Sequence, residues 1–211
     1  MQFRAYKIPK WPRRLFKGAI FDFASDAKTI YLTFDDGPHP ETTPLLLDVL
    51  DQFNIKATFF CLGENVKDYP QLFQRILDKG HAIGNHAMNH IKGTMTNTND
   101  YIKDVETATE LINSKLFRPP YGKIKPSQFK ALKQKGYRII FWSIMAYDFD
   151  QNLSTDTFIS KMQKLAYPGA IYVFHDNQKS IETIQNELPK VIEALIDDGY
   201  EFKKIEPELF S

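Results

Sequence analysis

Segments with the pattern of buried strands alternate with segments of helical periodicity along most of the chain. Strands are expected at residues 29–34, 57–62, 82–86, 137–144, 170–176 and 200–205. Helices are expected at residues 43–53, 69–80, 99–115, 125–136, 155–166 and 181–199. Because parallel strands need crossover connections, this alternation predicts a parallel sheet with helices packed outside it. Both a (β/α) barrel and an open doubly wound sheet satisfy the pattern.

Local signals mark where several helices begin, end or break. Thr43 is predicted to cap the helix at 43–53, with Pro44 at its first position. Gly80 is predicted to close the helix at 69–80. Pro189 is expected to kink or divide the last long helix, because proline has no backbone N–H to donate.

The composition favours one globular domain and excludes several classes of function. Of the 211 residues, 43% are hydrophobic and 25% charged, which is enough to form a sizeable core. The net charge of +1, from 27 basic and 26 acidic residues, predicts no overall attraction to nucleic acid. No apolar run reaches membrane-spanning length. No signal peptide is visible, which predicts a cytoplasmic location, with the cell envelope or secretion as the alternative.

Residues 1–28 are expected to form a basic and aromatic arm, and residues 29–211 a single domain. Trp11, Leu15 and Phe16 are predicted to pack the arm onto the domain. Contact of this basic arm with an anionic membrane surface is the less favoured alternative, because its prolines interrupt an amphipathic helix.

Polar side chains gather at the ends of the predicted strands, which is where both candidate folds place their chemistry. The residues that follow or close these strands are Asp35, Asp36, His86, His90, Arg118, Pro120, Tyr121, Asp148 and His175. A purely structural role does not predict such a concentration, so the sequence indicates a functional rim.

The segment HAMNH places His86 and His90 four residues apart. On one face of a helical turn, two imidazoles at this spacing can bind one cation. Two exposed histidines are the alternative for this segment taken alone. A carboxylate from another strand end would complete a set of three ligands with positions left open for water and substrate.

The segment TFDDGP ends a strand with two adjacent carboxylates, Asp35 and Asp36, which repel each other unless their surroundings differ. If Asp36 binds the cation, Asp35 is left beside the water that the cation activates and can take its proton. Arg118 would then hold Asp35 ionised and oriented. A pair of solvated turn aspartates is the alternative.

His175 closes a predicted strand and is a candidate general acid. Hydrolysis of a C–N bond needs a group that protonates the departing amine, which a metal-bound histidine does poorly. Asp148 is available to orient His175 and raise its pKa. A buried histidine bonded to the backbone is the alternative.

Five motifs carry a resemblance to a known family. They are TFDDGP at 33–38, HAMNH at 86–90, RPPYG at 118–122, WSIMAYDF at 142–149 and VFHD at 173–176. Over residues 29–205 the chain resembles the polysaccharide deacetylases of the NodB-homology class, carbohydrate esterase family four. The resemblance implies a distorted (β/α) barrel, typically seven-stranded, and metal-dependent removal of acetyl groups from glycans.

The resemblance also implies roles for matching residues around the cation. Asp35 matches the general base, and Arg118 matches the residue that positions it. Asp36, His86 and His90 match the ligands of one divalent metal ion. Zinc is the expected ion, with cobalt, nickel or manganese as alternatives.

Further matches concern the leaving group and the acetyl group. His175 matches the general acid, and Asp148 matches its tuning partner. Tyr121 matches the residue whose backbone N–H binds the oxyanion, with Pro120 beside it in the same motif.

The chain departs from the family pattern at positions next to the matched residues. Ala87 stands where Ser or Thr commonly braces the histidine loop, which implies weaker metal binding. Met145, Phe149 and Val173 replace a usual Asp, Trp and Leu. Phe149 and Val173 are therefore expected in the substrate pocket, where these changes alter substrate choice more than activity.

The sequence thus predicts an enzyme that removes acetyl groups from an acetylated carbohydrate, a chitin-oligomer or peptidoglycan-like glycan. An O-acetyl glycan esterase or a small-amide hydrolase with the same residues is the first alternative. A glycan-binding domain without catalytic activity is the second.

Overall fold

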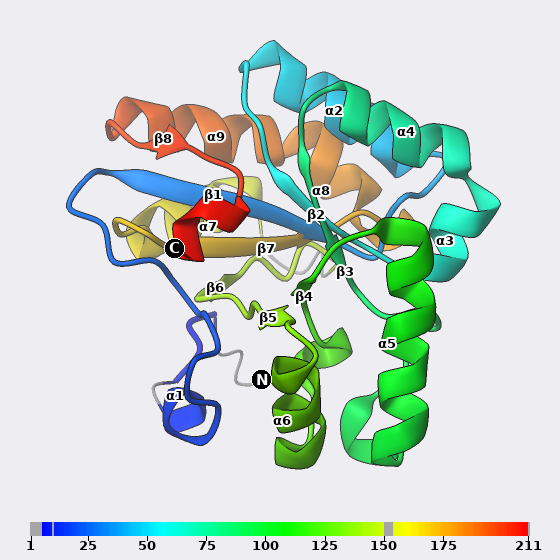
Figure 1. Ribbon diagram of the computed structural model, residues 1–211. Helices are drawn as coiled ribbons and strands as arrows, with labels where there is room; N and C mark the ends of the chain where they lie inside the picture. The colour runs from blue at the N-terminus through cyan, green and yellow to red at the C-terminus, as the bar shows by residue number, and fades with distance from the viewer. Residues whose placement is uncertain (1–5, 10, 150–153, 211) are drawn as a thin grey trace.

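The computed structural model describes residues 6–9, 11–149 and 154–210. A curled parallel sheet has its helices packed around the outside, and the carboxyl ends of its strands meet at one rim (Figure 1). Residues 1–5 and 10 of the predicted arm lie outside the described residues, as do residues 150–153 and 211.

Within the described residues, seven strands follow the order β5-β4-β3-β2-β1-β7-β6, and β8 pairs with β1 off this path. They are β1 Thr29–Asp35, β2 Thr58–Cys61, β3 Ala82–Asn85, β4 Leu116–Phe117, β5 Arg138–Ile139, β6 Ile144–Met145, β7 Ile171–His175 and β8 Glu201–Phe202. Every pairing between these strands is parallel. The sheet is curled with its helices around the outside, whereas an open doubly wound sheet has helices on both faces, so the predicted distorted (β/α) barrel is confirmed.

The helices follow the expected alternation, with two additions. They are α1 Trp11–Leu15, α2 Thr42–Gln52, α3 Gly63–Asp68, α4 Pro70–Asp78, α5 Thr98–Ile112, α6 Pro126–Gln134, α7 Thr155–Leu165, α8 Ile181–Asn186 and α9 Leu188–Asp197. The short helices α1 and α3 have no counterpart among the predicted helices. The last helical segment is divided as predicted, with Pro189 in the first turn of α9, where its missing N–H is tolerated.

The predicted cap of α2 is wrong. Glu41 occupies the cap position, and α2 already begins at Thr42. The Thr43 hydroxyl instead donates to Asp176 Oδ2 at 2.6 Å and accepts from the His39 N–H at 2.7 Å. The Thr43 hydroxyl therefore makes a tertiary hydrogen bond to Asp176 instead of capping the helix.

The predicted strand 137–144 is also wrong, because it is interrupted between β5 and β6. At this break the N-terminal arm supplies the missing backbone partners. Ile20 donates to the Ile139 carbonyl at 2.9 Å and accepts from the Phe141 N–H at 2.7 Å, while Ile8 donates to Ser143 at 3.2 Å. The arm thus bonds along the segment that joins the two edge strands.

The side chains of the arm pack differently from the prediction. Phe16 is buried in a cluster with Phe129 and Phe141, as expected. Trp11 and Leu15 are 65% and 52% exposed, so Phe16 is the one of the three predicted contact residues that is buried. The arm is held mainly by its backbone bonds and by Phe16, which leaves the outer side of α1 free.

Alternation along β1 decides which of its side chains reach the interior of the barrel. Ile30, Leu32 and Phe34 point outward into the core beneath the helices. Tyr31 belongs to the inner cluster, and by the period of two Asp35 lies on the same inner face. The same alternation in β7 places His175 on the inner face, where it is the direct neighbour of Asp35 in the register between β1 and β7.

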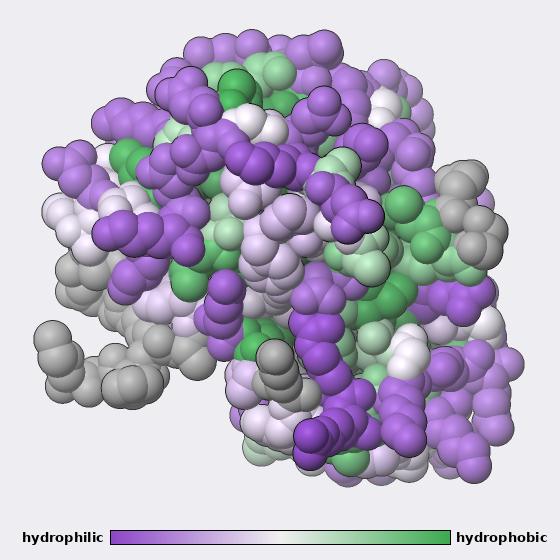
Figure 2. Space-filling model, turned by 90° about the vertical axis from the view of Figure 1, so that its left-hand side faces the viewer, coloured by the Kyte–Doolittle hydropathy of each residue, from purple (hydrophilic) through white to green (hydrophobic). Residues whose placement is uncertain are grey.

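None of the helices in the described part of the chain has both the length and the apolar composition of a membrane-spanning segment. The face turned to the viewer in Figure 2 is mostly hydrophilic, with scattered apolar patches.

A pair of glycines tests how the arm is joined to the barrel. Gly169 and Gly136 both have positive φ, +83° and +85°. Their surroundings differ, because a Cβ on Gly169 would lie 1.7 Å from the Phe23 carbonyl oxygen, whereas a Cβ on Gly136 would face open space. Gly169→Ala should lower the free energy of unfolding by about 3 kcal/mol or more, because backbone must move. Gly136→Ala should lower it by only about 1 kcal/mol, from left-handed strain alone. Urea unfolding of both variants measures this, and equal losses would contradict the close approach.

Candidate active site

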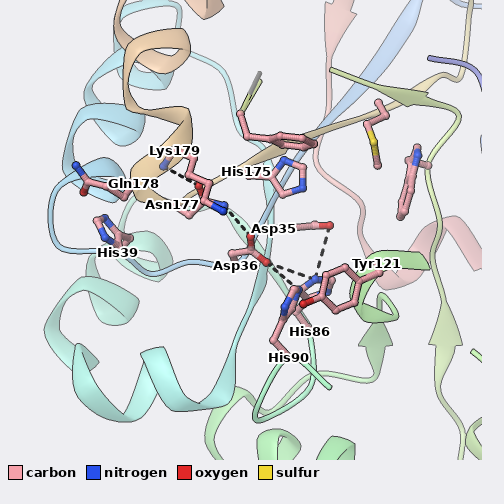
Figure 3. A pocket seen from close by; sticks show the side chains of 13 residues that line it. Asp35, Asp36, His39, His86, His90, Tyr121, His175, Asn177, Gln178 and Lys179 are labelled. Carbon is pink, nitrogen blue, oxygen red and sulfur yellow. Dashed lines mark hydrogen bonds and ion pairs between the residues drawn. The ribbon is translucent and has the colours of Figure 1, made fainter. Parts of the chain in front are cut away.

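A hollow of about 670 Å³ opens at the carboxyl ends of the strands (Figure 3). Its lining includes seven residues that the sequence analysis singled out: Asp35, Asp36, His86, His90, Tyr121, Phe149 and His175. They come from the ends of β1, β3, β4 and β7 and from the loop after β6. The predicted functional rim is therefore a single concave site.

Three of these side chains form a cluster of potential metal ligands. One donor atom each from Asp36, His86 and His90 lies within 4.8 Å of the others. Asp36 Oδ1 is 3.3 Å from His90 Nε2 and 3.6 Å from His86 Nε2. Asp36 Oδ1 is buried and has no hydrogen-bond partner among the described residues. A buried carboxylate oxygen that faces two imidazole nitrogens suits a divalent cation.

The surroundings hold these groups in the protonation states that a cation requires. Burial lowers the pKa of His86, although Asp35 and Asp36 oppose the shift, so its imidazole is neutral near pH 7. Its Nδ1 lies 2.8 Å from the Arg118 carbonyl oxygen, which directs Nε2 toward Asp36. Burial raises the pKa of Asp36, but the nearby histidines, among them His175, and the hydrogen bond from Asn177 outweigh burial, so the pKa lies below its ordinary value.

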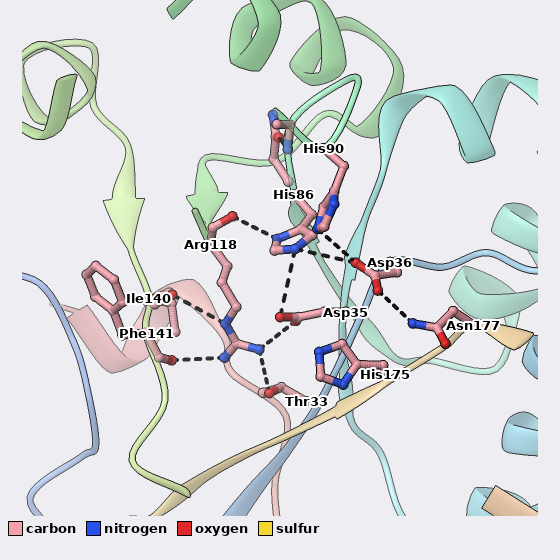
Figure 4. Close-up of polar contacts among 12 residues, drawn as sticks. Thr33, Asp35, Asp36, His86, His90, Arg118, Ile140, Phe141, His175 and Asn177 are labelled. Carbon is pink, nitrogen blue, oxygen red and sulfur yellow. Dashed lines mark hydrogen bonds and ion pairs between the residues drawn. The ribbon is translucent and has the colours of Figure 1, made fainter. Parts of the chain in front are cut away.

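Asp35 lies beside the cluster and is held by a buried arginine (Figure 4). Arg118, fully buried, donates from Nη1 to Asp35 Oδ1 and to the Thr33 hydroxyl, both at 2.7 Å. Its other nitrogens donate to the carbonyls of Ile140 and Phe141, at 3.4 Å and 2.9 Å. Asp35 Oδ2 is left facing the cluster, 3.9 Å from His86 Nε2. The two adjacent carboxylates thus have different partners.

His175 lies in the same hollow and is held by Asp148. Asp148 Oδ1 is 2.8 Å from His175 Nδ1, and its Oδ2 accepts from the His175 N–H at 2.6 Å. Burial lowers the pKa of His175, but the charge and hydrogen bond of Asp148 outweigh it and raise the pKa to about 9. His175 is therefore protonated at neutral pH, with Nε2 available to the hollow.

The predicted pocket-wall residues divide into two groups. Tyr121 is 58% exposed, has a φ of +58° and packs against His90 with the rings tilted by 50° and their centroids 4.5 Å apart. Phe149 packs edge-on against His175 at 5.3 Å and, like Tyr121, lines the hollow. Pro120 and Val173 are buried, and neither is among the lining residues. These two lie behind the wall of the hollow.

Asp176 and Asn177, for which the sequence suggested no role, hold the loop that carries Asp35 and Asp36. Asn177 donates to Asp36 Oδ2 at 2.8 Å. Asp176, fully buried, accepts from the hydroxyls of Thr42 at 2.5 Å and Thr43 at 2.6 Å, and its N–H donates to the Asp35 carbonyl at 2.7 Å. Asp176 closes a predicted strand and Asn177 follows it, so their position was the signal that could have identified them.

The histidine loop is braced from α5 by Asp104, which the sequence analysis missed. Asp104 Oδ2 accepts from the Met88 N–H at 2.9 Å, and its Oδ1 accepts from Asn89 Nδ2 at 2.6 Å. The Ala87 N–H donates to Asn85 Oδ1 at 2.7 Å, so this loop has a brace without the hydroxyl expected in the family pattern. Asp104 lies on the buried stripe of α5, where an acidic residue is unusual, and that position was its signal.

Comparisons with known proteins agree with this fold and site. The sequence profile described as "Polysaccharide deacetylase" matches residues 24–140. The Bacillus subtilis (strain 168) peptidoglycan-N-acetylmuramic acid deacetylase PdaA is 37% identical over 197 residues, covering 87% of this chain and 72% of the relative. A Bacillus cereus peptidoglycan-N-acetylglucosamine deacetylase is 35% identical over 188 residues, covering 86% and 68%.

A solved structure, the Bc1960 peptidoglycan N-acetylglucosamine deacetylase, superposes with a TM-score of 0.86 at 31% identity and covers 95% of both chains. This chain belongs to the polysaccharide deacetylase family. Enzymes of the family are metal-dependent, and the three-donor cluster fits a divalent cation.

The brace on the histidine loop leads to a prediction about metal affinity. Asp104→Ala should weaken binding of Zn²⁺ about tenfold, because the segment between the two histidines loses its anchor while both imidazoles remain. Isothermal titration with Zn²⁺ measures the dissociation constant. Glu106→Ala, a change of an exposed carboxylate on the same helix, is the matched control and should leave it unchanged. An unchanged dissociation constant in a folded Asp104→Ala variant would show that the loop holds its shape unaided.

Proposed function

We propose that this protein is a metal-dependent deacetylase that hydrolyses the acetamido group of an N-acetylated glycan. The observation that carries the proposal is that two differently held groups, Asp35 and His175, lie beside the three-donor cluster in one hollow. The names of the relatives, which include peptidoglycan and chitooligosaccharide deacetylases, support the same substrate class.

Asp36, His86 and His90 would hold the cation. A bound divalent cation lowers the pKa of water and polarises the carbonyl of the acetyl group. Zinc is proposed because two imidazoles and one carboxylate are typical of its catalytic sites, and cobalt, nickel or manganese accept the same donors.

Asp35 is proposed as the general base. Arg118 holds its Oδ1 and leaves Oδ2 free toward the cluster, so the carboxyl group keeps one orientation. Asp35 takes a proton from the water that attacks the carbonyl carbon. The N–H of Tyr121 is proposed to stabilise the negative charge that develops on the carbonyl oxygen.

His175 is proposed as the general acid. Asp148 occupies its Nδ1 and raises its pKa, so His175 carries a proton at neutral pH. That proton passes from Nε2 to the departing nitrogen as the C–N bond breaks, and the products are acetate and a free amine. A glycan-binding domain without activity has no evident use for these two separately held groups.

Substrate identity is proposed from the open shape of the hollow and from the relatives. Met145 and Phe149 both line the wall, so the departures at these two positions bear directly on the substrate. The proposed substrate is an oligomer of N-acetylglucosamine or a peptidoglycan-like chain. The predicted cytoplasmic location stays a prediction, since the relatives act by name on peptidoglycan.

Acetate release tests the proposed activity. N-acetylglucosamine oligomers should release acetate in the presence of Zn²⁺ or Co²⁺, and chelation should abolish the release. Asp35→Asn should lower kcat about 10²–10⁴-fold through loss of the base. Asp48→Asn, a change of an exposed carboxylate on α2, is the matched control. Release only from O-acetylated glycans or from small amides would favour those alternatives, and no release from any of them would refute the enzyme.

The pH profile tests the assignment of the acid. Asp148→Asn removes the charge that raises the pKa of His175, so this pKa should fall from about 9 toward about 6.5. Because the protonated form is active, the alkaline limb of kcat/KM should move to lower pH by a similar amount. Asp156→Asn, in the first turn of α7, is the control. An alkaline limb that stays in place would remove His175 from the role of acid.

A further inference from the structure

A second hollow, of about 370 Å³, adjoins the first and shares two of its walls. Tyr121 and Trp142 line both hollows. The far side of the second hollow is formed by the N-terminal arm, with Trp11 and Leu15 on its rim. Its volume lies within the range of about 300–1,000 Å³ that is usual for small-ligand sites.

Large apolar side chains remain exposed around this one hollow. Trp11 is 65% exposed, Tyr121 58% and Leu15 52%. Single exposed apolar residues are ordinary, but a group of them around one concavity indicates a binding surface. Trp142, only 8% exposed, forms part of the wall that continues into the first hollow.

The arm that carries Trp11 is fixed before any ligand arrives. Arg13 forms two hydrogen bonds with Asp22, at 2.7 Å and 2.6 Å, which tie α1 to the segment after it. Ile20 forms two backbone bonds with the segment after β5. Phe16 anchors the end of α1 in the core. A preformed wall lets a ligand bind without paying to order the arm.

We propose that the second hollow is a binding subsite for a neighbouring sugar residue of the glycan chain whose acetyl group is removed at the first. This inference rests on the proposed function. A pyranose ring has apolar C–H faces and a hydroxyl edge, which suit the flat ring of Trp11 together with the polar Thr94 and Lys123 in the same wall. Because Tyr121 and Trp142 line both hollows, the second hollow lies directly beside the first, at the position of a neighbouring sugar residue.

An anionic membrane surface is the competing occupant, because Arg13 and Arg14 accompany the exposed Trp11 on α1. The geometry favours the glycan. The apolar side chains line a concave site that shares Tyr121 and Trp142 with the candidate active site, whereas membrane contact needs a protruding face.

Dependence of the reaction on chain length tests the subsite. N-acetylglucosamine oligomers of two to six units are compared by acetate release in the metal-loaded, full-length protein. For Trp11→Ala, the ratio of kcat/KM between the longest and the shortest oligomer should fall about tenfold, through KM, because one aromatic contact is lost. Trp11→Phe keeps a flat ring and should retain most of the ratio. Ile196→Ala, a change of an exposed apolar residue on α9, is the matched control.

The outcomes separate this inference from the proposed function. An unchanged length dependence in Trp11→Ala, or an equal loss for all lengths, would overturn the subsite while the deacetylase stands. Loss of binding to phosphatidylglycerol vesicles with an unchanged length dependence would assign the surface to a membrane. No acetate from any oligomer with the unmodified protein would overturn the proposed function and the subsite together.

Discussion

The buried ion pair between Arg118 and Asp35 supports both the barrel and its chemistry. Arg118 has no exposed surface, and its guanidinium is satisfied by Thr33, by two main-chain carbonyls and by the face of Phe60 at 4.1 Å. Removing one partner of such a pair leaves an uncompensated charge, at a typical cost of about 3–5 kcal/mol. Arg118 follows β4 and its contacts reach β1 and the segment after β5, so it links strands on both sides of the barrel interior.

Within one hollow, different surroundings give the two histidines His86 and His175 different protonation states and give the two aspartates different partners. Burial keeps His86 neutral, whereas Asp148 keeps His175 protonated. The same contrast separates the two carboxylates, because Asp35 is bonded to an arginine while Asp36 leaves one buried oxygen unpaired. Neutral imidazole and an unpaired carboxylate oxygen are what a cation binds, while a protonated histidine is what a leaving amine needs. The arrangement therefore separates metal binding from proton transfer.

The N-terminal arm joins the stability of the fold to the shape of the site. Its backbone bonds lie along the segment between β5 and β6, the two edge strands, which do not pair with each other. That segment also supplies Trp142, which lines both hollows, so any displacement of the arm would also change the wall of the candidate active site. The same attachment presents Trp11 at the rim of the second hollow.

The sequence by itself determined the parallel alternation, the strand-end positions of Asp35 and His175, and the division of the last helix at Pro189. These follow from periodicity and backbone chemistry, which act over a few residues. Only the tertiary structure decided that the arm interrupts the strand at 137–144 and that Thr43 binds Asp176 rather than capping its helix. It also placed Asp104 beneath the histidine loop. Each of these features is a contact between segments that lie far apart in the sequence. A local sequence pattern does not show which distant segment a residue will contact.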